Sequence, residues 1–246
     1  MSLRRSFRPT DGFLLGGTIA VYFDPSSQCR FVVAEPAQQP ELWRAYLAGA
    51  STSYGKHGVA SVLEYDRTCD GRSTAIFFAA LDEMDSVVGG MRVQGRYRDA
   101  REAHALEEWA GREGTDRLRD EIEDRLPDGV IEMKTGWVSD SVTHRHHLTN
   151  ALARIFVHSL RLMDARYALG TVAEHAVRRW QTTGGVVSAD VAPVAYPDPS
   201  YRTVPMWWDA QTFADLTDPE QLPLILREVA QIDASAQRRP LSEITA

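Results

Sequence analysis

A strand, a helix and a second strand follow one another between residues 130 and 172, and this order constrains the fold more than any other part of the chain. Residues 130–138 form an apolar run with strand character, which begins directly after a turn. Apolar side chains over 148–163 recur with the helical period, and residues 167–172 form another short strand-like run. Strands and helices in this order predict α/β or α+β architecture with a mixed sheet.

The preceding half of the chain predicts antiparallel structure. Three strand-like runs, 60–66, 73–81 and 87–97, are separated by short polar turns, which is the spacing of a β-meander. A charged stretch over 99–125 then has helical spacing and is divided by glycines. Together the two halves predict a mixed, mostly antiparallel central sheet that is flanked by helices.

The length of 246 residues favours one large domain. We place this domain at residues 31–218. Residues 1–30 precede it as an N-terminal arm with one possible strand, and residues 219–246 follow it as a C-terminal helical tail.

Composition excludes several classes of function. The formal net charge of −7 gives no indication of nucleic-acid binding or of an anionic membrane surface. The two cysteines, Cys29 and Cys69, do not have the spacing of metal ligands and fit a reducing compartment. No apolar run is long enough to span a bilayer and no targeting segment is evident, so we expect a cytoplasmic protein. The sequence does not fix the oligomeric state.

From residue 130 onward the order of elements resembles the acyl-CoA-binding half of the GNAT superfamily of N-acyltransferases. The resemblance makes 130–138 the central strand and 139–147 the turn that faces the pyrophosphate of the carrier. It makes 168–172 a second strand, which splays from the first and admits the pantetheine arm. The implied donor is an acyl-CoA or acyl-carrier-protein thioester, held at the positive end of the next helix. The implied carrier-binding residues are Val138, Arg145, His146, His147 and Thr149.

Two positions depart from the pattern of the superfamily. The turn and helix start over 142–149 contain no glycine for close approach of the backbone to phosphate, so carrier binding falls to side chains such as Arg145 or to an altered turn. Trp180 stands where many members place a tyrosine that protonates the leaving thiolate. An indole N–H is too weak an acid for that role, but a thiolate can leave unprotonated at neutral pH.

A narrower resemblance covers the middle of the chain. It is similar to the autoinducer-synthase branch, the acyl-homoserine-lactone synthases and the related N-acyl amino acid synthases. The matching segments are 62–66, 73–80 and 88–93, and the matching residues are an acidic pair, Glu64 and Asp66, followed by Arg92 and by Glu132 on the central strand. The resemblance implies transfer of an acyl group from the thioester to the amine of a small, amino-acid-like acceptor by direct attack.

Acyl transfer to an amine needs a proton acceptor and bound, aligned reactants. Glu132 lies in the middle of an apolar strand and is the candidate base; alternatively it faces outward or pairs with Lys134 or Arg92. Glu64 and Asp66, two apart on one predicted strand, lie on one face and suit a substrate ammonium, unless both are solvated. Arg92 suits a carboxylate of the acceptor or the acidic pair.

Trp137 and Trp207 are candidate substrate-binding side chains, and one tryptophan of the 207–208 pair is expected to line an acyl pocket. The alternative to an enzyme is a GNAT-like ligand-binding or sensor protein whose pyrophosphate turn has degenerated. A metal-dependent hydrolase built on His144, His146 and His147 is the least supported class, because no second ligand motif accompanies them. We therefore expect no metal.

Overall fold

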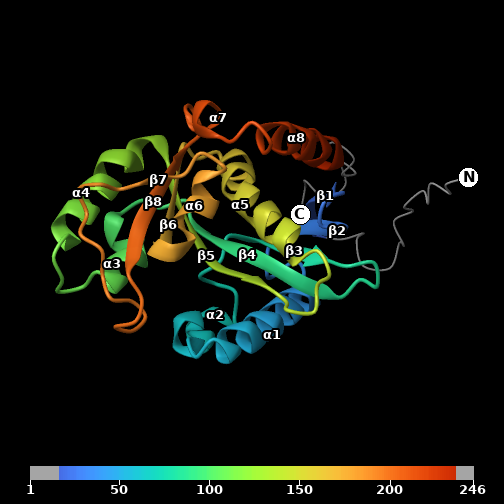
Figure 1. The fold of residues 1–246 in the computed structure, drawn as a ribbon, viewed down its shortest axis with the longest axis horizontal. Helices are drawn as coiled ribbons and strands as arrows, with labels where there is room; N and C mark the ends of the chain where they lie inside the picture. The colour runs from blue at the N-terminus through green and yellow to red at the C-terminus, as the bar shows by residue number, and fades with distance from the viewer. Residues whose placement is uncertain (1–16, 237–246) are drawn as a thin grey trace, which may run out of the picture.

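The computed structural model describes residues 17–236, which form one eight-stranded sheet with helices on both faces (Figure 1). The order of the strands across the sheet is β1-β2-β3-β4-β5-β6-β8-β7. Neighbouring strands are antiparallel except β5 and β6, which are parallel. The predicted mixed, mostly antiparallel sheet is therefore confirmed. The strands are β1 (Thr18–Asp24), β2 (Cys29–Ala34), β3 (Ile76–Leu81), β4 (Val87–Gly95), β5 (Val130–Val138), β6 (Tyr167–Ala173), β7 (Val186–Val187) and β8 (Thr203–Asp209).

The helices are concentrated in the connections around this sheet. The α-helices are α1 (Pro40–Lys56), α2 (Tyr65–Thr68), α3 (Ala105–Glu108), α4 (Thr115–Arg125), α5 (Arg145–Leu162), α6 (Val177–Gln181), α7 (Phe213–Leu216) and α8 (Leu222–Ala236). Short 3-10 helices are η1 (Ala60–Leu63), η2 (Ala100–Glu102), η3 (Leu126–Asp128) and η4 (Glu174–Ala176). Among residues 17–236, none of these helices has the length and apolar character needed to cross a membrane.

The two faces of the sheet are covered differently. On one face, α5 and α8 pack over a single continuous hydrophobic cluster that includes Ile155, Trp208 and Ile225 (Figure 1). On the other face there are two clusters. One lies under α1, with Trp43, Tyr46 and Trp137, and the other lies under α3 and α4, with Trp109 and Trp207. The strip of sheet between these two clusters carries polar residues, as described below.

Two glycines allow α1 to lie close to β4 and β5. A Cβ atom at Gly49 of α1 would come within 2.0 Å of the Trp137 ring, and one at Gly90 of β4 would come within 2.1 Å of the Phe78 carbonyl oxygen. The ring of Tyr46 also lies 3.0 Å from that second position. Glycine at both places is therefore a condition for the packing of α1.

Two predicted elements are found at or near their predicted bounds. The strand predicted over 130–138 is β5, and the predicted helix over 148–163 is α5, which begins three residues earlier. Part of the predicted N-terminal arm, residues 18–24, forms β1 and pairs with β2 at the edge of the sheet; residues 1–16 lie outside the described part of the chain.

The strand predicted over 60–66 is wrong. Residues 60–63 form η1 and residues 65–68 form α2, and Glu64 between them has a positive φ of 44°. Alternating apolar residues imitate a strand in this segment, but only Leu63 among residues 60–66 is fully buried. The segment therefore crosses the end of α1 as two short turns of helix, so Glu64 and Asp66 do not share the face of a strand.

Buried charges fasten the C-terminal helix to the domain. The guanidinium of Arg154 on α5 donates to both carboxylate oxygens of Glu228 on α8, at 2.8 and 2.6 Å, and lies 3.1 Å from Asp24 of β1. His158 Nε2 lies 2.7 Å from Glu228. All four side chains are nearly inaccessible to water. Burial raises the pKa of Glu228, but the His158 and Arg154 contacts outweigh it and hold the pKa below its ordinary value.

We predict that Glu228→Gln lowers the free energy of unfolding by about 3 kcal/mol, because it leaves Arg154 buried with one carboxylate fewer. The matched control is Asp233→Asn, which breaks an exposed α8–α5 ion pair with Arg161 and costs less than about 1 kcal/mol. Urea unfolding at neutral pH measures both. Equal losses for the two variants would contradict the importance assigned to the buried cluster.

Candidate active site

The pairing of β5 with β6 stops before the strands end. The last paired residues are Met133 and Gly170, although β5 continues to Val138 and β6 to Ala173. A cavity of about 290 Å³ occupies the place where the two strands separate. Its lining comes from both faces of the sheet: Phe156 and Trp180 on the α5 and α6 side, and Tyr54, Val62, Glu108 and Tyr196 on the α1 and α3 side. The cavity thus lies between the strands, within reach of both faces.

A bulge in β5 shapes the wall of this cavity. Gly90 pairs with Trp137 and Arg92 pairs with Lys134, so β5 contains one residue more than β4 over the same length. Thr135 in the bulge has a φ of +53°, a conformation that is unfavourable for a β-branched residue. Two contacts hold it: its carbonyl oxygen accepts from the Tyr46 hydroxyl at 2.6 Å, and its hydroxyl accepts from Arg92 Nε at 3.1 Å.

Polar side chains of β4 and β5 project from the strip between the two hydrophobic clusters. Arg92 is the cross-strand partner of Lys134, and Gln94 is the partner of Glu132, so all four lie on one face. This is the face that α1 and α3 cover. The strip therefore forms a charged floor beside the cavity.

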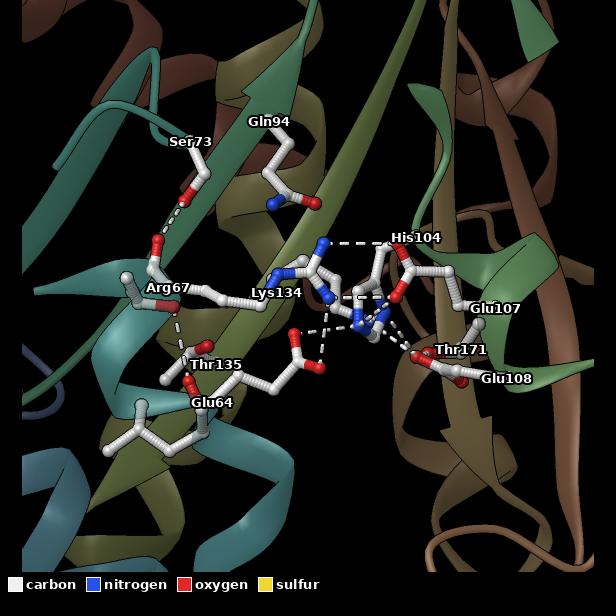
Figure 2. Close-up of polar contacts among 12 residues, drawn as sticks. Glu64, Arg67, Ser73, Gln94, His104, Glu107, Glu108, Lys134, Thr135 and Thr171 are labelled. Atoms are coloured by element: carbon white, nitrogen blue, oxygen red, sulfur yellow. Dashed lines mark hydrogen bonds and ion pairs between the residues drawn. The ribbon is translucent and has the colours of Figure 1, made fainter. Parts of the chain in front are cut away.

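Lys134 is the centre of a buried network (Figure 2). Its ammonium contacts Glu108 of α3 at 2.5 Å, His104 Nδ1 at 2.9 Å and Glu132 at 3.5 Å. Glu108 Oε1 also accepts from the Thr171 hydroxyl of β6 at 3.1 Å. The other oxygen of Glu108, Oε2, is buried and has no hydrogen-bond partner among residues 17–236. Glu108 contributes to the lining of the cavity, so this buried, unpartnered acceptor lies close to the cavity.

Glu132, the predicted base, is fully buried behind this network. Its Oε2 accepts from the Tyr97 hydroxyl at 2.9 Å and from the His104 backbone N–H at 2.8 Å. It does not line the cavity. Glu132 is instead paired with Lys134, which is one of the alternatives that the sequence left open. The contacts of Glu132 fix the start of α3 and the position of His104.

His104 joins the buried network to the surface. Its Nδ1 lies 3.1 Å from Glu108 Oε1 and its Nε2 lies 3.0 Å from Glu64 Oε2. The Glu64 side chain is 29% exposed, and Arg67 links it to Glu107 of α3 through contacts of 3.2 and 2.8 Å. Asp66, the other member of the predicted acidic pair, is exposed and does not join this network. The structure thus brings Glu64 to the site and separates Asp66 from it.

The charges of the network stabilise one another. Burial alone raises the pKa of Glu108, but Lys134 and His104 outweigh it and hold the pKa below its ordinary value. Burial lowers the pKa of Lys134, and Glu108 with Glu132 reverses this and raises it. Both groups are therefore ionised at neutral pH. Burial raises the pKa of Tyr54 and of Tyr196 to about 12, so these two cavity hydroxyls keep their protons.

Two groups of side chains in the described part of the chain lie close enough to share a metal ion: Glu64 with His104 and Glu107, and His104 with Glu108 and Glu132. Lys134 and Arg67 already place a cation against these groups. A metal ion at either group would therefore have to compete with a cationic side chain. The cluster at His144, His146 and His147 is not among these groups.

The remaining predicted substrate residues lie away from the cavity wall. Arg92 is buried, and its guanidinium donates to the hydroxyls of Thr135 and Thr74, at 3.1 and 3.4 Å. Trp137 packs under α1. The indole N–H of Trp207 donates to Glu121 at 2.9 Å. Trp207 also lines a second cavity together with Arg125, and the Arg125 guanidinium lies 4.5 Å from the centre of the Trp207 ring.

The predicted carrier-binding residues gather where β5 leads into α5. Val138 ends the strand, and Arg145, His146 and His147 are exposed in the first turn of the helix. The Thr149 hydroxyl donates to the Arg145 carbonyl at 2.8 Å. Arg145 lies 3.5 Å from Asp140, which also pairs with Lys56. The amides of this turn point out of the helix end, as an anion site requires.

Sequence reasoning missed His104, Glu108 and Lys134 as members of the site. Two signals pointed to them. His104 and Glu108 have the i, i+4 spacing of one helical face beside the buried Ala105 and Trp109. Lys134 stands two residues from Glu132 on one strand, hence on the same face.

Comparisons with known proteins agree with this architecture. The chain is 45% identical over 202 residues to the uncharacterized protein Rv1356c of Mycobacterium tuberculosis H37Rv, which covers 82% of this chain and 77% of that protein. The uncharacterized protein Mb1391c of Mycobacterium bovis has the same identity and coverage. No protein-family model matches. In structure the chain is similar to FeeM, an N-acyl amino acid synthase from uncultured soil microbes, with a TM-score of 0.57, 12% identity, and coverage of 78% of this chain and 97% of that one. The fold is that of the GNAT N-acyltransferases.

We predict that Glu108 and Lys134 are strongly coupled. In a double-mutant cycle of Glu108→Gln and Lys134→Met, urea unfolding at pH 7 should give a coupling free energy of about 2–3 kcal/mol. The exposed Arg67 and Glu107 pair, tested as Arg67→Met and Glu107→Gln, should give less than about 1 kcal/mol.

The Glu108–Lys134 coupling should depend on pH in one direction. Because the folded pKa of Glu108 is lowered, its stabilisation is complete above the unfolded value of about 4.3 and is lost as the pH falls through the folded pKa. A coupling that grows on acidification would contradict the ion pair.

Proposed function

This chain belongs to the family of the mycobacterial protein Rv1356c, and from its fold and its cavity we propose that it is an N-acyltransferase. It would move an acyl group from the thioester of CoA or of an acyl carrier protein to the amine of a small, amino-acid-like acceptor. The observation that carries the proposal is the cavity between β5 and β6, which is lined from both faces of the sheet and includes Glu108, whose buried Oε2 has no partner among residues 17–236.

The donor is proposed to enter between the separated ends of β5 and β6. Beyond Met133 and Gly170 these strands no longer pair with each other, which leaves a slot for an extended pantetheine arm. The phosphates would lie at the first turn of α5, against its amides and the side chains of Arg145, His146 and His147. Val138 and Thr149 would border this turn. The absence of glycine there makes side chains the main contacts.

The acceptor is proposed to approach from the side of α1 and α3. An ammonium group is a donor that suits the unpartnered Oε2 of the ionised Glu108. Val59, Val62 and Tyr201 give the same side of the cavity apolar and aromatic walls. An amine held there by its nitrogen would face the thioester between the strands, which supplies the proximity that acyl transfer needs.

The leaving group requires little help from the protein. Trp180 lines the cavity. It stands where many GNAT enzymes have a tyrosine that protonates the leaving thiolate, but its indole does not ionise. The hydroxyls of Tyr54 and Tyr196 keep their protons at neutral pH and line the same cavity. They are available to donate hydrogen bonds to the developing negative charge.

Two carboxylates compete for the central role. The sequence predicts Glu132 as the base from its place on the strand, and this role remains a proposal. Glu108 lines the cavity and Glu132 does not. We propose that Glu108 binds the amine and that Glu132 positions Lys134 and His104. Glu64 belongs to the same network, whereas Arg92, Trp137 and Trp207 would act through packing around it.

A binding protein without turnover is the second candidate function. The observation that favours it is the turn before α5, where Arg145 is already paired with Asp140. Such a protein would bind the carrier and leave the thioester intact in the presence of every amine.

We predict that thiol is released when the protein is mixed with a panel of acyl-CoA and acyl-carrier-protein thioesters and small amines. Glu108→Gln should lower kcat/KM at least about 100-fold, the range of general acid–base residues. Glu132→Gln should lower kcat with little change in carrier affinity. Turnover by Glu108→Gln at the wild-type rate would remove it from the site, and unchanged turnover of Glu132→Gln would remove Glu132.

Carrier binding is predicted to depend on the start of α5. CoA at 100 times its Kd should stabilise the protein by about 2.7 kcal/mol in a thermal-shift experiment. Arg145→Ala should weaken CoA binding about tenfold. Arg161→Ala is the matched control, because it removes an exposed arginine, also paired with an aspartate, at the other end of the same helix. Equal effects of the two variants would argue against a phosphate site at this turn.

A further inference from the structure

We propose that Glu108, His104 and Glu64 form a proton relay, which carries the proton of the acceptor amine from the cavity to the surface. The proposal rests on the proposed acyl transfer at the cavity. The three side chains come from η1–α2 and from the α3 region, and they are continuous through contacts of 3.1 and 3.0 Å on the two sides of the imidazole ring (Figure 2).

A relay is needed because Glu108 alone is a poor acceptor for the proton of the amine. Lys134 keeps Glu108 ionised, which suits the binding of an ammonium but makes the carboxylate a weak base. A proton taken from the amine must therefore move on to a stronger base. The ring of His104 is in contact with the same carboxylate, and an imidazole can accept a proton at one ring nitrogen and release one from the other.

The surroundings of His104 favour a passing positive charge. Glu108 faces Nδ1 and Glu64 faces Nε2, with Glu107 at 3.9 Å from Nε2. Lys134 is the one cation of the described residues with a contact to the ring, at 2.9 Å from Nδ1. Two carboxylates on opposite sides of the ring stabilise an imidazolium. The ring is almost entirely buried, so the partly exposed Glu64 is its route to water.

The proton balance is as follows. An N–H bond of the acceptor ammonium breaks and an O–H bond forms on Glu108. This O–H bond breaks as the proton bonds to His104, which becomes an imidazolium between two carboxylates. The nitrogen lone pair released from the ammonium attacks the thioester carbonyl and forms the C–N bond. As the C–S bond breaks, a second N–H proton passes from the nitrogen to the departing sulfur, so the products are the amide and the thiol. The imidazolium then loses its Nε2 proton to Glu64, which releases it to water. The ring is left with its proton on Nδ1, and a reorientation of the ring returns the N–H to the Glu64 side before the next turnover.

The surface end of the relay is the place to test it. Glu64→Gln keeps the size of the side chain and removes its ability to accept a proton, while Arg67 retains Glu107 as a partner. We expect kcat to fall about tenfold with KM for the acceptor unchanged, and added imidazole to restore part of the rate. Glu113→Gln, an exposed change of the same type after α3, should leave kcat unchanged. A Glu64→Gln enzyme with normal kcat would overturn the relay.

A second readout is independent of turnover. In protein with ¹⁵N-labelled histidine, the exchange of the His104 ring N–H with water can be followed by NMR. Glu64→Gln should slow this exchange about tenfold, and Glu113→Gln should not change it; an unchanged rate in Glu64→Gln would contradict the relay. If wild-type protein releases no thiol with any amine, the proposed function fails, and the exchange rate still decides the relay.

Discussion

The parallel pairing between β5 and β6, and its end at Met133 and Gly170, is the constraint on which the site depends. Six of the seven neighbouring strand pairs in the sheet are antiparallel, and only this pair requires a crossover helix, α5. The crossover places the start of α5 at the end of β5, while the separation of the strands leaves the cavity. The β5–α5–β6 connection therefore produces both the positive N-terminal end of α5 and the opening between β5 and β6.

The charged network occupies the boundary between the cluster under α1 and the cluster under α3 and α4. Ionised groups in such a place cost free energy unless each has a partner. Lys134 meets this condition with Glu108, Glu132 and His104, and Glu132 is further held by Tyr97. Two carboxylate oxygens of this network, Glu108 Oε2 and Glu132 Oε1, have no hydrogen-bond partner in residues 17–236, and of the two residues only Glu108 lines the cavity.

The sequence predicted those parts of the fold where apolar periodicity reflects burial. β5 is predicted from an apolar run that begins directly after a turn, and α5 from apolar side chains that repeat with the helical period. The segment 60–66 imitates a strand because it is a short run with apolar and aromatic residues that ends at a polar turn, whereas a positive φ at Glu64 changes the chain direction. Hydrophobic periodicity does not reveal such a local turn. The conformation of this segment is determined by its contacts with α1 and α3.

The site was only partly predictable for a related reason. Glu132 stood out as one acid in an apolar strand, but His104 and Glu108 lie in a charged stretch with the pattern of a solvated helix. Their burial arises from partners that are distant in sequence, Lys134 and Thr171. A hydrophobicity pattern contains no information on such pairing.

The most direct test of the central claim is a crystal structure with an unreactive thioether analogue of an acyl carrier. The account predicts that the sulfur lies between Lys134–Gly136 of β5 and Thr171–Ala173 of β6, with the phosphates at the first turn of α5. An analogue bound elsewhere, for example in the cavity beside Trp207 and Arg125, would contradict it.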